Sequence, residues 1–126
     1  WQLLKEIHLP PPGAARGVYL KLRLRKSIDY PLLGVAVNIV ADIGKGTLKE
    51  VALALTAVEK SPLLITTPAK IAESSDLETQ AAIMSEAATK IAHPIANTAG
   101  YSPRYRRYMV KVYVTQAIGQ AMALVS

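Results

Sequence analysis

The sequence predicts an α+β domain: an antiparallel sheet of three to four strands with helices packed on one face. The main observation is a change of hydrophobic period. Apolar residues follow the period of strands before Val58 and the period of helices after Ser75. Size agrees with this prediction, because 126 residues of which 51% are hydrophobic suffice for one core and would be few for two domains.

A basic strand is expected over residues 18–25, where leucine alternates with lysine and arginine. The leucines are predicted to face the core: Leu20, Leu22 and Leu24. The basic residues are predicted to share the opposite face: Lys21, Arg23 and Arg25. Residues 26–31 break the alternation and are expected to form a loop.

Three further strand segments follow. Residues 32–40 are almost continuously apolar, which is typical of a strand covered on both faces. Residues 48–58 alternate large and small side chains, and the two glycines within 42–46 predict a turn between these runs, hence an antiparallel hairpin. Residues 63–66 are predicted to form a further short strand.

Two helices are predicted for the remainder. Ser75 with Glu78 has the spacing of a capping box, and the helix that it starts is expected to end at His93. Ser102 followed by Pro103 is typical of a second helix start. The second helix has one apolar stripe at helical spacing: Val110, Val114, Ala117, Ala121 and Val125.

Tyrosine and arginine interleave over residues 101–108, a pattern that also occurs in nucleic-acid binders. On a helix, Arg104 and Arg107 point one way, and Tyr105 and Tyr108 lie on neighbouring faces. We therefore expect the tyrosines to pack the helix onto the sheet, while the arginines face solvent or pair with acids.

Several kinds of site are excluded or disfavoured. Without cysteine, the chain has no disulfide, no cysteine-ligated zinc, no iron–sulfur cluster and no thiol nucleophile. Residues 44–47 lack the full P-loop spacing, and no GxGxxG motif is present. Of the two histidines, His93 is expected to cap a helix end and His8 to be exposed. We predict no catalytic residue and no metal ligand, and no apolar run approaches the roughly 20 residues of a membrane span.

The charge balance favours anionic partners, because fifteen Lys and Arg against nine Asp and Glu give a net charge of +6. The basic face of the first strand is either a solvated surface or a site for an anionic ligand or an acidic partner. Asp29 and Tyr30 follow this strand directly. A tyrosine there could offer a stacking face to a planar ring, and the carboxylate could accept a ring N–H.

The run at residues 19–30 reads Tyr-Leu-Lys-Leu-Arg-Leu-Arg-Lys-Ser-Ile-Asp-Tyr, and Leu-Gly-Val-Ala-Val follows at 33–37. Together they resemble the opening of the C-terminal domain of the flavin subunit of molybdenum hydroxylases, the xanthine dehydrogenase and carbon monoxide dehydrogenase family. Pro-Ile at 94–95 and Tyr-Arg-Arg at 105–107 are similar to its later part. Ile-His-Leu-Pro at 7–10 resembles the end of a preceding FAD domain.

The resemblance divides the chain at its prolines. Residues 1–17 are expected to be the tail of a preceding FAD domain and a proline-rich linker, and residues 18–126 the flavoprotein C-terminal domain. The sequence opens with Trp1 rather than Met, so we expect it to be a piece of a longer protein. Within the family, residues 27–32 and 105–110 are most similar to the β subunits of 4-hydroxybenzoyl-CoA reductases.

The resemblance also implies a function, in which the C-terminal domain closes over FAD and docks to partner subunits of a cytoplasmic oxidoreductase. Electrons would pass between FAD, bound mainly by the preceding FAD domain, and iron–sulfur clusters. The clusters and the molybdenum cofactor would be carried by partner subunits, and this domain alone would be inactive. No nucleic acid is expected as a partner.

The same resemblance implies four cofactor-binding residues. Lys21 and Asp29 would lie near the polar edge of the flavin and Tyr30 against its ring, with Arg25 as a further basic residue of the site. Lys26 stands where many relatives carry a second arginine, and a lysine cannot make the bidentate contact of an arginine. Two alternative functions are a basic nucleic-acid-binding module and a purely structural assembly domain.

Overall fold

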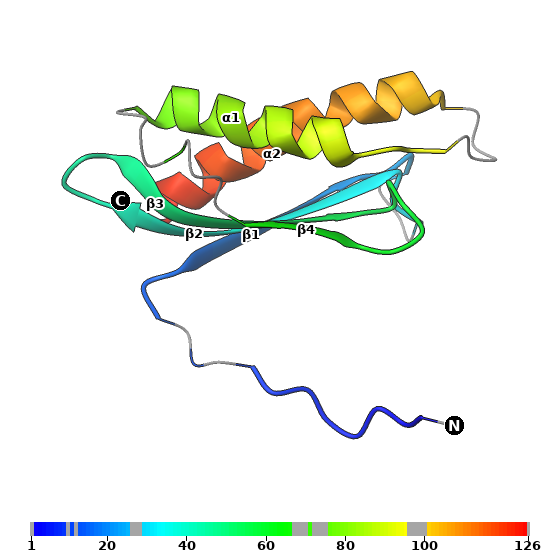
Figure 1. The fold of residues 1–126 in the computed structure, drawn as a ribbon, viewed down its shortest axis with the longest axis horizontal. Helices are drawn as coiled ribbons and strands as arrows, with labels where there is room; N and C mark the ends of the chain where they lie inside the picture. Colours follow the sequence, from blue (N-terminus) through cyan, green and yellow to red (C-terminus); the bar gives the residue numbers. More distant parts are fainter. Residues whose placement is uncertain are drawn as a thin grey trace.

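In the described part of the chain, four antiparallel strands and two helices form two layers, with both helices on the same face of the sheet (Figure 1). The computed structural model describes residues 2–9, 11, 13–25, 29–66, 71, 76–95 and 101–125. The strands lie in chain order: β1 (Arg16–Leu22), β2 (Leu33–Asp42), β3 (Thr47–Thr56) and β4 (Leu63–Thr66). The helices are α1 (Leu77–Ile91) and α2 (Pro103–Ala123). The predicted α+β fold with an antiparallel sheet is confirmed.

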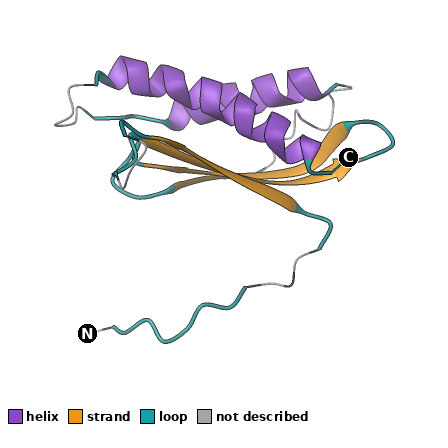
Figure 2. Cartoon of the chain, turned by 180° about the vertical axis from the view of Figure 1, so that it is seen from behind, coloured by secondary structure: helices purple, strands orange, loops and turns teal. Residues whose placement is uncertain are grey.

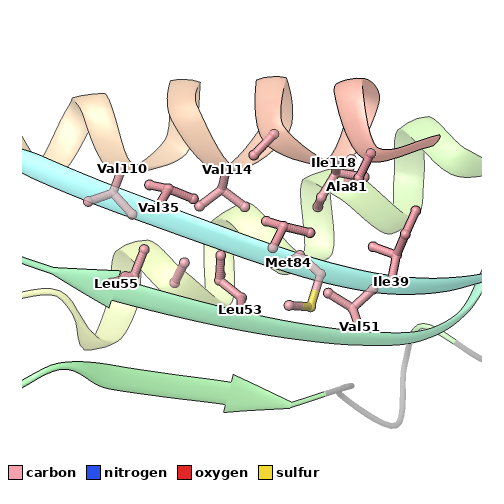
Figure 3. Close-up of a cluster of buried hydrophobic side chains, with 14 of the residues drawn as sticks. Val35, Ile39, Val51, Leu53, Leu55, Ala81, Met84, Val110, Val114 and Ile118 are labelled. Atoms are coloured by element: carbon pink, nitrogen blue, oxygen red, sulfur yellow. The ribbon is translucent and has the colours of Figure 1, made fainter. Parts of the chain in front are cut away.

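The core lies between the layers (Figure 3). Every second residue of β2 and β3 points toward the helices and is buried: Val35, Val37, Ile39, Val51, Leu53 and Leu55. Four of the five residues of the predicted stripe of α2 are buried on the other side, and Val125 lies half-buried just beyond the helix. Removing one such Val or Leu side chain from water contributes about 1.5–3 kcal/mol, so this face holds the helices on the sheet.

The first strand ends at Leu22, earlier than the predicted residue 25. It pairs with β2 from Arg16 opposite Ile39 to Leu22 opposite Leu33, where β2 begins. The Leu32 amide donates to the Leu22 carbonyl at 2.8 Å and closes the ladder. Beyond this point there is no paired strand, so the expectation that residues 23–25 continue the strand is wrong, and Leu24 is exposed.

The third strand also ends before the predicted Val58. Its last residue is Thr56, and Ala57 has a φ of 64°, a left-handed conformation that does not continue a strand. The hairpin between β2 and β3 and the short strand β4 match the prediction.

Both helices begin at polar caps, but the cap of α1 differs from the prediction. Asp76 is the N-cap, and its carboxylate accepts the Thr79 amide at 2.8 Å. The predicted cap, Ser75, lies outside the described residues. An aspartate adds its charge to the positive end of the helix dipole, which favours it as the cap. In α2, Ser102 accepts the Tyr105 amide at 3.1 Å and Pro103 follows, as predicted.

A buried glutamine that the sequence analysis did not single out joins α1 to the sheet. The Gln80 side chain accepts the Leu48 amide at 2.7 Å and donates to the carbonyls of Leu48 and Ile71, each at 3.1 Å. This side-chain amide therefore hydrogen-bonds backbone groups at the start of β3 and in the segment before α1.

No helix among the described residues lies on the second face of the sheet (Figures 1 and 2). The N-terminal segment, residues 2–9, runs on this side of the sheet, away from the helix layer. No helix in the described part of the chain is long and apolar enough to cross a membrane.

Candidate functional site

Lys21 and Asp29 come together where β1 ends. The Lys21 ammonium donates to the main-chain carbonyl of Asp29 at 2.5 Å. Lys21 pairs with Gly34, which alternates along β2 with the core residues Leu33 and Val35, so the lysine side chain is on the face of the sheet opposite the helices. The contact joins β1 to the β1–β2 connection, eight residues further along the chain.

One oxygen of the Asp29 carboxylate, Oδ2, is shielded from solvent and has no hydrogen-bond partner among the residues that the structure describes. A buried carboxylate oxygen without a donor costs stability, because its hydration is lost and not replaced. One acceptor of this carboxylate is therefore without a donor in the described part of the chain.

Tyr30, the next residue in the chain, is presented to solvent, with a relative exposure of 92%. Pro31 follows and restricts the backbone of Tyr30 to extended angles, and the next residue, Leu32, is buried. A large aromatic ring thus projects from a connection whose far end is anchored in the core.

Arg25 is exposed on the same connection, and Lys26 lies outside the described residues. Because β1 ends at Leu22, Arg23 and Arg25 do not share the sheet face of Lys21, and the expectation of one basic strand face is wrong. The structure brings Lys21 and Asp29 into contact, with Tyr30 next in the chain.

Tyr19 extends this site along the uncovered face. A methyl group built on Gly34 would lie 2.8 Å from the Tyr19 hydroxyl and 2.2 Å from Thr56 Oγ1. The tyrosine side chain therefore lies over Gly34 of β2, where an added methyl group would collide with it. Tyr19 is 57% exposed and lies two residues from Lys21 on the same face of β1.

Behind the site, Arg106 of α2 is buried, with a relative exposure of 5%. Its Nε donates to the Leu32 carbonyl at 3.1 Å, its Nη1 to the Ile95 carbonyl at 2.6 Å and its Nη2 to the Ala57 carbonyl. Burial lowers the pKa of Arg106 from its usual value. The guanidinium thus satisfies carbonyls from three separate connections with one fork.

This arrangement corrects part of the expectation for residues 101–108: Arg104 and Arg107 are exposed as expected, but the tyrosines and Arg106 are not placed as expected. Tyr105 and Tyr108 are 39% and 63% exposed, whereas Arg106 lies inside. The tyrosines do not hold α2 on the sheet, and the ring of Tyr105 instead lies beside that of Tyr101 with centroids 5.4 Å apart. The physical reason is that the connections leave carbonyl groups in the interior that only a donor can satisfy.

His93 does not cap α1 as expected. Arg107 donates to the Ala92 carbonyl at 2.9 Å and approaches His93 Nδ1 at 2.6 Å, while the His93 amide donates to Glu59 Oε1 at 3.1 Å. Arg107 also lines a cleft of about 350 Å³ on the helix layer, together with Glu86, Thr89, Lys90 and Lys111. His8 is exposed, as expected, and lies 3.1 Å from Glu6.

No group of three His, Asp or Glu side chains within the described ranges is arranged to hold a metal ion.

Solved structures with the same fold include CO dehydrogenases and a quinoline oxidoreductase. Quinoline 2-oxidoreductase from Pseudomonas putida 86 matches with a TM-score of 0.75 and 24% identity, over 90% of this chain and 39% of that chain. The cyanide-inactivated Cu,Mo-CO dehydrogenase matches with a TM-score of 0.73 and 24% identity, over 90% and 38%. The CO dehydrogenase of Hydrogenophaga pseudoflava lacking the Mo-pyranopterin moiety matches with a TM-score of 0.70 and 25% identity, over 89% and 38%.

The chain therefore spans less than two-fifths of the length of the solved chains that it matches. Residues 18–121 match the family model described as the CO dehydrogenase flavoprotein C-terminal domain. The match covers both layers of the fold and the residues of the site. The chain belongs to the CO dehydrogenase flavoprotein C-terminal domain family.

Proposed function

We propose that this domain covers the FAD of a molybdenum-hydroxylase flavin subunit, and that Lys21, Asp29 and Tyr30 face the isoalloxazine ring. The observation that carries the proposal is the shielded Oδ2 of Asp29, which has no partner among the described residues, with the exposed Tyr30 next in the chain and Lys21 on the Asp29 main-chain carbonyl. Family membership supports a flavin as the cofactor class, and the contact between Lys21 and Asp29 supports this end of β1 as the part proposed to meet it.

The donor and acceptor set fits a flavin. An isoalloxazine is planar and apolar over most of its area, and one edge carries carbonyl oxygens and a ring N–H. Asp29 Oδ2 can accept that N–H, and Lys21, which has three donors and uses one on the Asp29 carbonyl, can donate to a ring carbonyl. The Tyr30 ring can lie on the apolar part and exclude water from it.

When bound, FAD supplies the electron-transfer chemistry, and the domain supplies position and electrostatics. Lys21 places a positive charge at the site and so favours negative charge beside it. Asp29 fixes orientation through a hydrogen bond that is lost if the ring turns. Arg25, exposed on the same connection, adds a cation at the rim of the site.

The FAD-binding part of the same subunit is the first partner in this proposal. The N-terminal segment supports this choice of partner, because it runs on the side of the sheet away from the helices (Figure 2). The register of β1 puts Lys21 on the same side. The greater length of the solved chains agrees with a large additional part. Iron–sulfur clusters and the molybdenum cofactor belong to partner subunits in this proposal, which agrees with the absence of cysteine from this sequence.

Within the family, we assign the chain to the 4-hydroxybenzoyl-CoA reductase type, acting in the cytoplasm. The similarity of residues 27–32 and 105–110 to the β subunits of those enzymes supports this assignment. Reduction of 4-hydroxybenzoyl-CoA by the complex that contains the complete subunit would test it, and failure to reduce this substrate would remove the assignment without affecting the flavin site.

The site itself is tested in the complete flavin subunit with Tyr30→Ala and Asp29→Asn. Both should change the flavin absorption spectrum, the retention of flavin on gel filtration and the reduction potential. Tyr108→Ala is the control, because it also removes an exposed tyrosine but from α2. If both site variants match the wild type in all three measurements while folded, these residues do not touch the flavin.

A further inference from the structure

We propose that Arg106 is a positioning residue: from inside the domain it fixes the backbone of the connection that carries Asp29 and Tyr30. The inference rests on the proposed function for the role of the site. The hydrogen bonds by which Arg106 holds this connection, which we call the clamp, do not depend on that function. Arg106 is 74 residues from Leu32 in the sequence, so the bond between them joins α2 directly to the site connection.

Both backbone groups of Leu32, its amide and its carbonyl, are hydrogen-bonded. The Leu32 amide donates to the Leu22 carbonyl at 2.8 Å, and the Leu32 carbonyl accepts from Arg106 Nε at 3.1 Å. The Leu32 side chain is buried as well. These contacts leave the residue little freedom to rotate.

Pro31 transmits this constraint to the site. Its ring fixes its own φ, and it restricts the backbone of the preceding residue, Tyr30, to extended angles. With Leu32 fixed, few freely rotating backbone dihedral angles remain between Leu32 and the Tyr30 Cα. At the opposite end of the same stretch, Lys21 holds the Asp29 carbonyl. Arg106 and Lys21 thus fix the two ends of a four-residue segment.

The other two bonds of Arg106 make the clamp stiff. They go to Ala57, which has a left-handed backbone conformation, and to Ile95, which follows α1. A guanidinium held by three carbonyls cannot follow one of them without releasing the others. A lysine at this position would have one nitrogen in place of three and could not reach all three carbonyls from separate directions.

The test is hydrogen exchange measured by mass spectrometry on the complete flavin subunit, for Arg106→Gln, Arg106→Lys and Arg107→Gln. Arg107 is the matched control, because it is adjacent, but its described bonds go to Ala92 and His93. We expect peptides covering residues 29–33 to exchange at least ten-fold faster in Arg106→Gln, while those covering 35–39 stay within two-fold of the wild type. Arg106→Lys should give an intermediate increase, and Arg107→Gln none at 29–33.

A second measurement separates positioning from simple stability. The flavin spectrum and reduction potential of Arg106→Gln should shift in the same direction as those of Tyr30→Ala, and Arg106→Lys should restore part of the shift. If Arg106→Gln does not fold, Arg106→Lys carries the same comparisons. Unchanged exchange at 29–33 in a folded variant, or an equal increase in every peptide, overturns the clamp.

The outcomes distinguish the clamp from the proposed flavin site. Faster exchange at 29–33, with an unchanged flavin spectrum and reduction potential, would show that Arg106 holds the backbone. It would contradict the positioning role of Arg106 and count against the flavin site. Unchanged exchange, together with altered flavin properties in Asp29→Asn and Tyr30→Ala, would uphold the flavin site and remove Arg106 from it.

Discussion

Tyr19 and Gly34, on adjacent strands, fit together so closely that a methyl group on residue 34 would stand 2.8 Å from the tyrosine hydroxyl. The same methyl group would stand 2.2 Å from Thr56 Oγ1, on the strand beyond. Because residue 34 has no side chain, Tyr19 of β1 and Thr56 of β3 can both pack against Gly34 of β2, on the face of the sheet opposite the helices. Lys21 lies directly opposite Gly34 in the ladder, so this packing is next to the proposed site.

Gly34→Ala is expected to destabilise the protein by about 1–3 kcal/mol, because the added methyl group must push Thr56 and Tyr19 aside. Gly119→Ala is the control. Gly119 is exposed on α2 with nothing within 4 Å of an added methyl group, so alanine there should stabilise by about 0.5–1 kcal/mol. Urea unfolding should give opposite signs for the two variants, and equal signs would contradict the packing described at Gly34.

Val114→Asp should cost roughly 3 kcal/mol or more, because it places an unpaired charge in the core beneath α2. Val112→Asp makes the same chemical change on the same helix at a position that is 37% exposed, and it should cost far less. Thermal unfolding of the two variants checks this face of α2. An unchanged Tm for Val114→Asp would mean that another face packs on the sheet.

The buried amide of Gln80 should not tolerate a carboxylate. Gln80→Leu removes the acceptor of the Leu48 amide and should cost about 1–3 kcal/mol. Gln80→Glu keeps the shape, but when ionised it presents only acceptors to the carbonyls of Leu48 and Ile71, so it should be the more destabilising of the two at neutral pH. Chemical denaturation at neutral and at acidic pH should show Gln80→Glu recovering part of its loss as the carboxyl takes up a proton.

The cap of α1 should give a stability contribution that depends on pH. The hydrogen bond from the Thr79 amide holds the pKa of Asp76 below its ordinary value of 3.8. A carboxyl whose pKa is lower in the folded protein stabilises above its unfolded pKa, and the contribution is lost as the pH falls through the folded pKa. Asp76→Ser keeps a capping oxygen without the titration, so the stability difference between wild type and variant should shrink below about pH 3.8. A difference that stays constant down to about pH 2 would contradict this linkage.

The regular elements could be predicted from the sequence because their signals are local. Alternation marked β3, and Ser102 with Pro103 marked the start of α2. The end of β1 could not be found this way. Its alternation continues to Arg25, and only the pairing with β2, which starts at Leu33, decides that the strand stops at Leu22.

The candidate site was predictable only in part for the same reason. The sequence places Asp29 and Tyr30 after a basic strand, but it does not show that Lys21 folds back onto the Asp29 carbonyl. The arginines of residues 101–108 were expected to face solvent or pair with acids, and Arg106 was not singled out among them. Its burial depends on three connections that meet at one end of the sheet, which no local pattern reveals.

The most direct test of the proposed flavin contact is a crystal structure of the complete flavin subunit with FAD bound. We predict that a ring N–H of the flavin lies within about 3.2 Å of Asp29 Oδ2, and that the Tyr30 ring contacts the isoalloxazine at about 4 Å. An isoalloxazine out of contact with Lys21, Asp29 and Tyr30, or a protein donor from elsewhere in the subunit on Asp29 Oδ2, would contradict it.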